Sequence, residues 1–163
     1  MRVKARIRPF RSQDASALAE IFYEAVHGIA AAHYTPAQIH AWAPALPNPA
    51  SMLERASDGR LVLVAVDEQD RPSAYGDLEA DGHIDHLFCR PVAARTGTVS
   101  TLYDHLEAAA RERGLGRLYV EASEPALRFF LRKDFILLQR RDFALRGVPI
   151  HNFAMEKRLP GSG

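Results

Sequence analysis

The 163-residue sequence contains a single cysteine, Cys89, so an internal disulfide is excluded. It has no uninterrupted apolar run of the roughly 18 residues that a transmembrane helix needs, and its first residues lack the apolar core of a secretory signal. The 21 basic and 20 acidic residues give a formal net charge of +1, which indicates neither nucleic acid nor an anionic membrane as partner. These absences predict a cytoplasmic protein that binds neither nucleic acid nor a membrane.

The composition that remains is that of an ordinary globular domain, with 47% hydrophobic and 25% charged residues. The chain length suits one domain with a sizeable core. We therefore predict a single domain over residues 1–159, followed by a flexible tail at 160–163. The sequence leaves open whether the domain forms a homodimer.

Apolar residues that alternate with polar ones predict strands, and apolar residues spaced three and four apart predict helices. Prolines after Thr35 and Asn48 mark the starts of two short helices. Predicted strands lie within residues 3–10, 61–66, 72–82, 83–89, 117–123, 135–147 and 148–159, and predicted helices within 12–33, 34–44, 48–59, 98–114 and 124–134. This order predicts one mixed α/β domain.

Four segments carry a resemblance that covers nearly the whole chain: "IRPFRSQD" at 7–14, "FYEAVHGIAAAHYTPAQIHAWAP" at 22–44, "GHIDHLF" at 82–88 and "LRGVPIHNFAMEK" at 145–157. The chain resembles the GNAT acyltransferases, and within them the YafP-like acetyltransferases. The resemblance implies a mostly antiparallel mixed sheet of about seven strands with helices on both faces. It also implies direct transfer of an acetyl group from acetyl-CoA to an amine of a small molecule or peptide in a ternary complex, without a metal.

The turn that grips the CoA pyrophosphate in this family has the form Q/R-x-x-G-x-G/A. Here it begins at Ala94, keeps Gly97 and ends at Val99, so two of its three positions depart from the pattern. Three interpretations of the turn remain open: a functional pyrophosphate-binding turn, a degenerate form of it, or an ordinary connection between a strand and a helix. The resemblance implies that CoA contacts would come from Leu87, Phe88, Cys89, Arg95, Thr96, Gly97, Thr98, Val99, Ser100, Ser123 and Phe130.

Acyl transfer needs a group that takes the proton of the amine, because a lysine-type amine has a pKa near 10.4. His83 lies eleven residues before the motif, where some family members carry a base, and strand alternation puts Asp85 on the same face to orient its ring. Asp85 itself, or Glu79 through a water, are alternatives. Phe130 replaces the acid tyrosine of many members, which leaves Tyr34 as candidate acid or substrate contact.

The acceptor amine is expected to contact Trp42, Glu79, Arg146 and Asn152, with His151 nearby in the closing hairpin. Alternation sends His86 to the face opposite His83, so no metal site is expected. Cys89 is interpreted as a small buried residue in preference to a nucleophile. Two rivals to the enzyme are a non-catalytic CoA-binding or effector-sensing module and a scaffold that acts through a partner surface.

Overall fold

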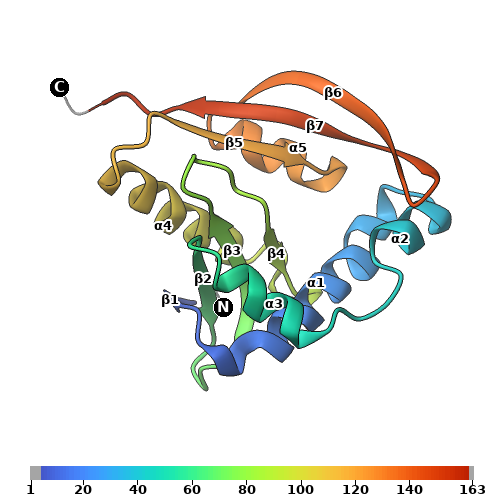
Figure 1. Cartoon of the computed structure of the whole chain (residues 1–163), viewed down its shortest axis with the longest axis horizontal. Coiled ribbons are helices and arrows are strands. Elements are labelled where there is room, and N and C mark those ends of the chain that lie inside the picture. The colour runs from blue at the N-terminus through green and yellow to red at the C-terminus, as the bar shows by residue number, and fades with distance from the viewer. Residues whose placement is uncertain (1–4, 162–163) are drawn as a thin grey trace.

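The computed structural model describes residues 5–161 (Figure 1). Residues 3–4 of the first predicted strand and residues 162–163 of the predicted tail lie outside the described residues. Within that range, the capped starts predicted after Thr35 and Asn48 are observed, each side chain accepting a backbone N–H of its helix. The elements in chain order are β1 Arg6–Pro9, α1 Ala15–Gly28, α2 Pro36–Trp42, α3 Pro49–Ala56, β2 Leu61–Val66, β3 Pro72–Leu78, β4 Leu87–Cys89, α4 Thr98–Glu112, β5 Arg117–Ala122, α5 Glu124–Arg132, β6 Ile136–Leu145 and β7 Val148–Arg158.

The predicted mixed α/β architecture with seven strands is confirmed for the described residues, with one difference in how the strands associate. They form two antiparallel sheets, ordered β1-β2-β3-β4 and β5-β7-β6, which Figure 1 shows below and above the centre of the molecule. An isolated parallel bridge between His83 and Tyr119 connects them. Gly82 permits this contact, because a Cβ there would lie 2.1 Å from the carbonyl oxygen of Arg117.

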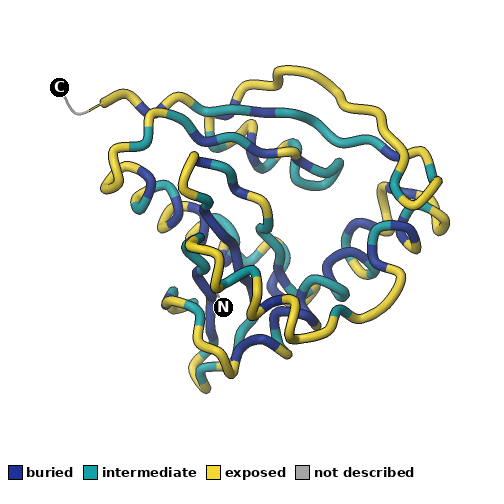
Figure 2. The backbone as a smooth tube through the Cα atoms, in the orientation of Figure 1, coloured by how far each residue is buried: buried dark blue, intermediate teal, exposed yellow. Residues whose placement is uncertain are grey.

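Side-chain alternation along β2 places helices on both faces of the first sheet. Leu63 and Ala65 belong to the core that contains Leu102 and Leu106 of α4. Val64 and Val66 pack on the opposite face with residues of α1 and α3. Figure 2 shows the resulting buried centre, and the exposed course of β6 at the molecular edge. Between residues 5 and 161, no helix is both long and apolar enough to cross a membrane.

The strand predicted over 83–89 forms only in its second half, and the buried carboxylate of Asp77 explains why. Its Oδ1 accepts the backbone N–H groups of Asp85 at 2.8 Å and His86 at 3.0 Å. Its Oδ2 accepts Arg55 Nη2 at 2.8 Å and Arg60 Nη1 at 2.9 Å. A side chain thus takes the place of strand carbonyls, and regular β3–β4 pairing ends at Gly76 and Leu87. The carbonyls of His86 and His83 still accept the N–H groups of Asp77 and Glu79.

We predict that Asp77→Asn lowers the free energy of unfolding by about 3–5 kcal/mol, because breaking one side of a buried ion pair leaves uncompensated charge. Asparagine keeps the size of the side chain but cannot accept from both the backbone and two guanidinium groups. Urea denaturation measures the change. Asp142→Asn is the control, since its ion pair with Arg140 is exposed and should contribute less than about 1 kcal/mol. An unchanged urea midpoint for Asp77→Asn would contradict the assignment.

Candidate active site

A cavity of about 370 Å³ opens where the two sheets diverge beyond the His83–Tyr119 bridge. One wall is residues 84–88 at the start of β4, and the facing wall is residues 120–123 at the end of β5, with Ala126 and Phe130 of α5. Aromatic residues of the α1–α2 region close one side, and the β6–β7 hairpin closes another. The end of regular β3–β4 pairing at Gly76 and Leu87 therefore creates the space between the sheets.

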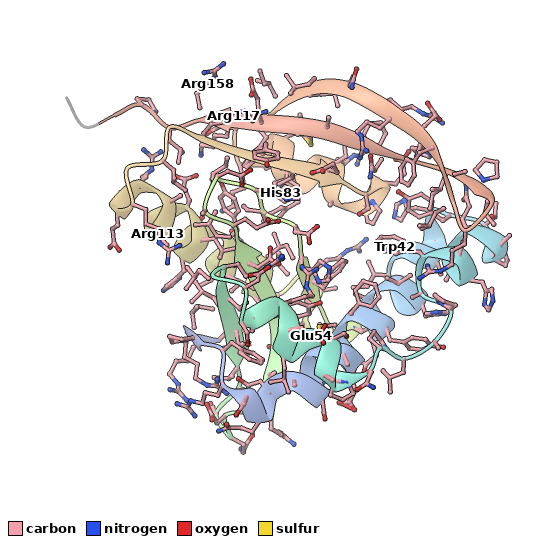
Figure 3. All side chains as sticks on the ribbon, viewed as in Figure 1. Trp42, Glu54, His83, Arg113, Arg117 and Arg158 are labelled. Atoms are coloured by element: carbon pink, nitrogen blue, oxygen red, sulfur yellow. The ribbon has the colours of Figure 1, made fainter. Side chains whose placement is uncertain are left out.

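His83 lies at the junction of the two sheets, below β5 in Figure 3. Its Nδ1 is 2.8 Å from Glu79 Oε1, and its Nε2 is 2.7 Å from Glu121 Oε2. The hydrogen bond to Glu121, followed by that to Glu79, outweighs burial and raises the pKa of His83 to about 9. At neutral pH the ring is therefore a cation that donates to both carboxylates. A neutral His83 that accepts the proton of the amine does not fit this geometry.

Asp85 does not orient the ring of His83, contrary to prediction, because residues 83–86 are not an alternating strand. Its Oδ2 accepts Arg55 Nη2 at 2.7 Å and lies 3.4 Å from Arg60 Nη1. Burial is the largest single influence on Asp85 and opposes its ionisation, but the hydrogen bond from Arg55 and the charges of neighbouring residues together outweigh burial and lower the pKa. Asp85 also lines the cavity. Because its pKa is lowered, it contributes an ionised carboxylate to the cavity wall.

His86 also lines the cavity, as an uncharged ring. Its Nδ1 is 2.9 Å from the hydroxyl of Tyr75, and its ring stacks on Phe22 at 5.6 Å between centroids. Burial lowers the pKa of His86 to about 4, so the ring is neutral across the physiological range. No group of three or more metal-ligating side chains occurs among residues 5–161.

Tyr34 and Trp42 line the cavity together, with their rings 5.8 Å apart in a T-shaped arrangement. Trp42 points from α2 toward the space under the β6–β7 hairpin (Figure 3). The Tyr34 hydroxyl donates to the carbonyl of His151 at 3.2 Å and accepts the N–H of Glu124 at 2.9 Å. Burial raises the pKa of Tyr34. The hydroxyl therefore stays protonated and links three separate segments.

The closing hairpin contributes one of its two predicted acceptor contacts to the cavity. Asn152 lines it, but Arg146 does not. Instead, Arg146 donates to the carbonyl of Ala41 and holds the hairpin against α2. Arg141, which sequence reasoning missed, lines the cavity and donates to Asn152 Oδ1 at 3.0 Å. Glu79, the fourth predicted contact, belongs to the His83 cluster outside the lining.

The turn before α4 has the backbone of an anion-binding helix start. Gly97 has φ +89° and Arg95 has φ +62°, and the helix ladder begins only with the Thr101 N–H bonded to the carbonyl of Gly97 at 3.0 Å. The N–H groups before it lack partners within the helix. The partly buried side chain of Val99 packs against the main core. Thr96 and Thr98 hydrogen-bond each other through their hydroxyl groups at 2.8 Å.

The remaining predicted CoA contacts divide between the cavity and the core. Leu87, Phe88, Ser123 and Phe130 line the cavity, whereas Cys89 lies outside the lining. Burial raises the pKa of the Cys89 thiol to about 11, so a reactive thiolate does not form near neutral pH. The hydroxyl of Ser100 accepts Lys133 Nζ at 2.7 Å, which fixes α5 against the start of α4.

Comparison with known proteins agrees with this architecture. The Acetyltransferase (GNAT) domain family matches residues 30–157. The chain belongs to the GNAT family. Over 150 residues it is 30% identical to the uncharacterized N-acetyltransferase YafP of Escherichia coli (strain K12), covering 92% of this chain and 93% of that protein. The predicted GNAT membership is thereby confirmed, and the chain is an N-acetyltransferase.

Solved structures of GNAT proteins superpose on the chain over nearly its full length. A GCN5-related N-acetyltransferase from Rhodopseudomonas palustris, described as an aminotransferase of class II, has a TM-score of 0.88 and 32% identity, covering 98% of this chain and 99% of that one. The PaiA N-acetyltransferase from Thermoplasma acidophilum, solved with coenzyme A, has a TM-score of 0.77 and 18% identity, covering 96% and 99%. The second likeness shows the shared GNAT fold.

We predict that His83 titrates near pH 9, against about 6.5 for a free histidine. A raised pKa means that its ion pairs stabilise the fold fully below pH 6.5 and are lost as the pH rises through 9. NMR titration of the ring protons gives the midpoint directly. Glu121→Gln should move the midpoint down, because Glu121 is the largest cause of the shift. A wild-type midpoint near 6.5 would show that the two carboxylates do not hold the ring.

Proposed function

We propose that the chain transfers an acetyl group from acetyl-CoA directly to an amine bound in the cavity between β4 and β5. The observation that carries the proposal is the position of Glu121, which lines the cavity while its Oε2 is bonded to the protonated ring of His83. A carboxylate held in the wall of a small cavity can attract an ammonium group and take its proton.

The start of α4 would hold the pyrophosphate of CoA. Unpaired N–H groups and the helix dipole favour an anion there, and the exposed Arg95 can add a charged hydrogen bond. The backbone N–H groups from Thr96 to Ser100 and the hydroxyl of Ser100 complete this set, and the partly buried side chain of Val99 packs against the main core. A Sinorhizobium meliloti phosphinothricin acetyltransferase of the same fold was solved with acetyl-CoA, which supports acetyl-CoA as the cosubstrate.

The thioester end of the cosubstrate would lie in the cavity, between Leu87 and Phe88 on one wall and Ser123 and Phe130 on the other. Acetyl-CoA supplies an activated carbonyl carbon. Backbone N–H groups near the start of β4 would stabilise negative charge on its oxygen. Ser123 caps α5 without a side-chain cap bond, so its hydroxyl is available to the leaving sulfur.

Proton transfer is assigned to Glu121, with His83 as a positioning residue. The ammonium group of the acceptor gives a proton to the carboxylate, and the neutral nitrogen attacks the thioester carbon. The new C–N bond forms as the C–S bond breaks, and the second proton that the nitrogen loses protonates the departing sulfur, so CoA leaves as the thiol. Tyr34 and Trp42 would contact the acceptor from the α1–α2 side, since both line the cavity. Asp85 adds a second negative charge that favours a cationic amine.

We predict that Glu121→Gln lowers turnover by about 10²–10⁴-fold, the usual contribution of a positioned base, without weakening acetyl-CoA binding. Glu79→Gln is the matched control, because Glu79 also bonds to His83 but does not line the cavity. It should lower turnover by less than about tenfold. The assay detects free CoA thiol with a panel of amines, and calorimetry measures acetyl-CoA binding. Wild-type turnover in a folded Glu121→Gln variant would contradict the base assignment.

A further inference from the structure

Arg141 is a cation of the cavity wall that no protein carboxylate neutralises among residues 5–161. Its Nη1 donates to Asn152 Oδ1 at 3.0 Å, and its guanidinium carbon lies 5.4 Å from the ring centroid of Phe143. The neighbouring cations are committed elsewhere. Arg140 pairs with Asp142 at 3.0 Å, and Arg146 donates to a backbone carbonyl. Arg141 is therefore the hairpin cation left to meet a ligand.

Strand register places Arg141 on the same face of the second sheet as Glu121. Glu121 pairs with Ala154, and Arg141 pairs with Asn152, two residues away on the shared strand β7. Directly paired residues share a face, and so do residues two apart along a strand. Neighbouring strands lie about 4.8 Å apart and residues rise about 3.3 Å each. The Cα atoms of Glu121 and Arg141 are thus roughly 12 Å apart. Side chains that extend toward each other bring the charged groups closer than that.

The Arg141 end of the cavity offers hydrogen-bond donors for an anion. Asn152 Oδ1 accepts from Arg141, so the amide nitrogen remains as a second donor, with no partner found for it in the described part of the chain. A guanidinium fork beside an amide N–H₂ matches a carboxylate, which has several acceptor sites and no donor. The opposite end carries the carboxylates of Glu121 and Asp85, which suit an ammonium group.

We propose that the acceptor is an amine that carries a carboxylate, of about amino-acid size, with the carboxylate at Arg141 and Asn152 and the amine at Glu121. This rests on the proposed acetyl transfer and specifies its substrate class. A cavity of about 370 Å³ that also admits a thioester end leaves room for a small acceptor only. Trp42, Phe88 and Phe143 add an aromatic lining to the cavity, which favours apolar side chains.

The test compares L-amino acids with their carboxamides, which keep the amine and lose the negative charge. The wild-type chain, Arg141→Gln and the control Arg140→Gln are assayed for release of CoA thiol from acetyl-CoA. Arg140 is adjacent, but its side chain alternates to the other face. Arg141→Gln should raise KM for the amino acid by about tenfold to a hundredfold, the effect of one charged hydrogen-bonding partner. Arg141→Gln should leave kcat, and the KM for the carboxamide, unchanged. Arg140→Gln should change neither KM nor kcat.

Equal use of acids and carboxamides by the wild-type chain would overturn this inference and leave acetyl transfer intact. So would an Arg141→Gln variant that raises KM equally for both. Acetylation of no amine in the panel would instead overturn the proposed transfer, and the inference with it. Thermal unfolding of each variant confirms that it is folded, which is expected because Arg141 and Arg140 are both exposed.

Discussion

The buried carboxylate of Asp77 is the interaction on which the site depends. It accepts two backbone N–H groups and two guanidinium groups, and no hydrogen-bond partner is missing for any buried side-chain polar atom among residues 5–161. Its hydrogen bonds replace those of a regular strand, so the first sheet ends early beside the junction at His83. The cavity exists because the two sheets then separate without leaving buried polar groups unpaired.

The strands and segments that line the cavity determine where its charged side chains lie. Two carboxylates line the cavity, Asp85 from the segment before β4 and Glu121 from β5. Asp85 is bonded to Arg55, and Glu121 is bonded to His83. The cation that holds Glu121 is His83, whose two ring nitrogens connect residues from both sheets. Arg141 is at the other end, on β6. One surface can therefore receive a molecule with charges of both signs.

Local sequence patterns predicted what depends on local physics. The apolar run at residues 61–66 predicted the strand β2, and proline after Thr35 and Asn48 located two helix starts. The segment 83–86 was mispredicted because its path depends on Asp77, Arg55 and Arg60, which are distant in sequence. Arg146 was predicted as an acceptor contact from its place in the closing hairpin, but its hydrogen bond to the carbonyl of Ala41, in a helix distant in sequence, could not be read from the local pattern. The alternation of Arg141 with Phe143 was the one signal available.

The central claim is that the divergence of β4 and β5 is the place where cosubstrate and acceptor meet. Backbone amide NMR of the ¹⁵N-labelled chain during addition of acetyl-CoA tests it most directly. The account predicts shifts at residues 95–100, where the pyrophosphate would bind, together with shifts at residues 84–88 and 120–123 on the two cavity walls. Shifts that appear only away from these segments, or no shifts at millimolar acetyl-CoA, would contradict it.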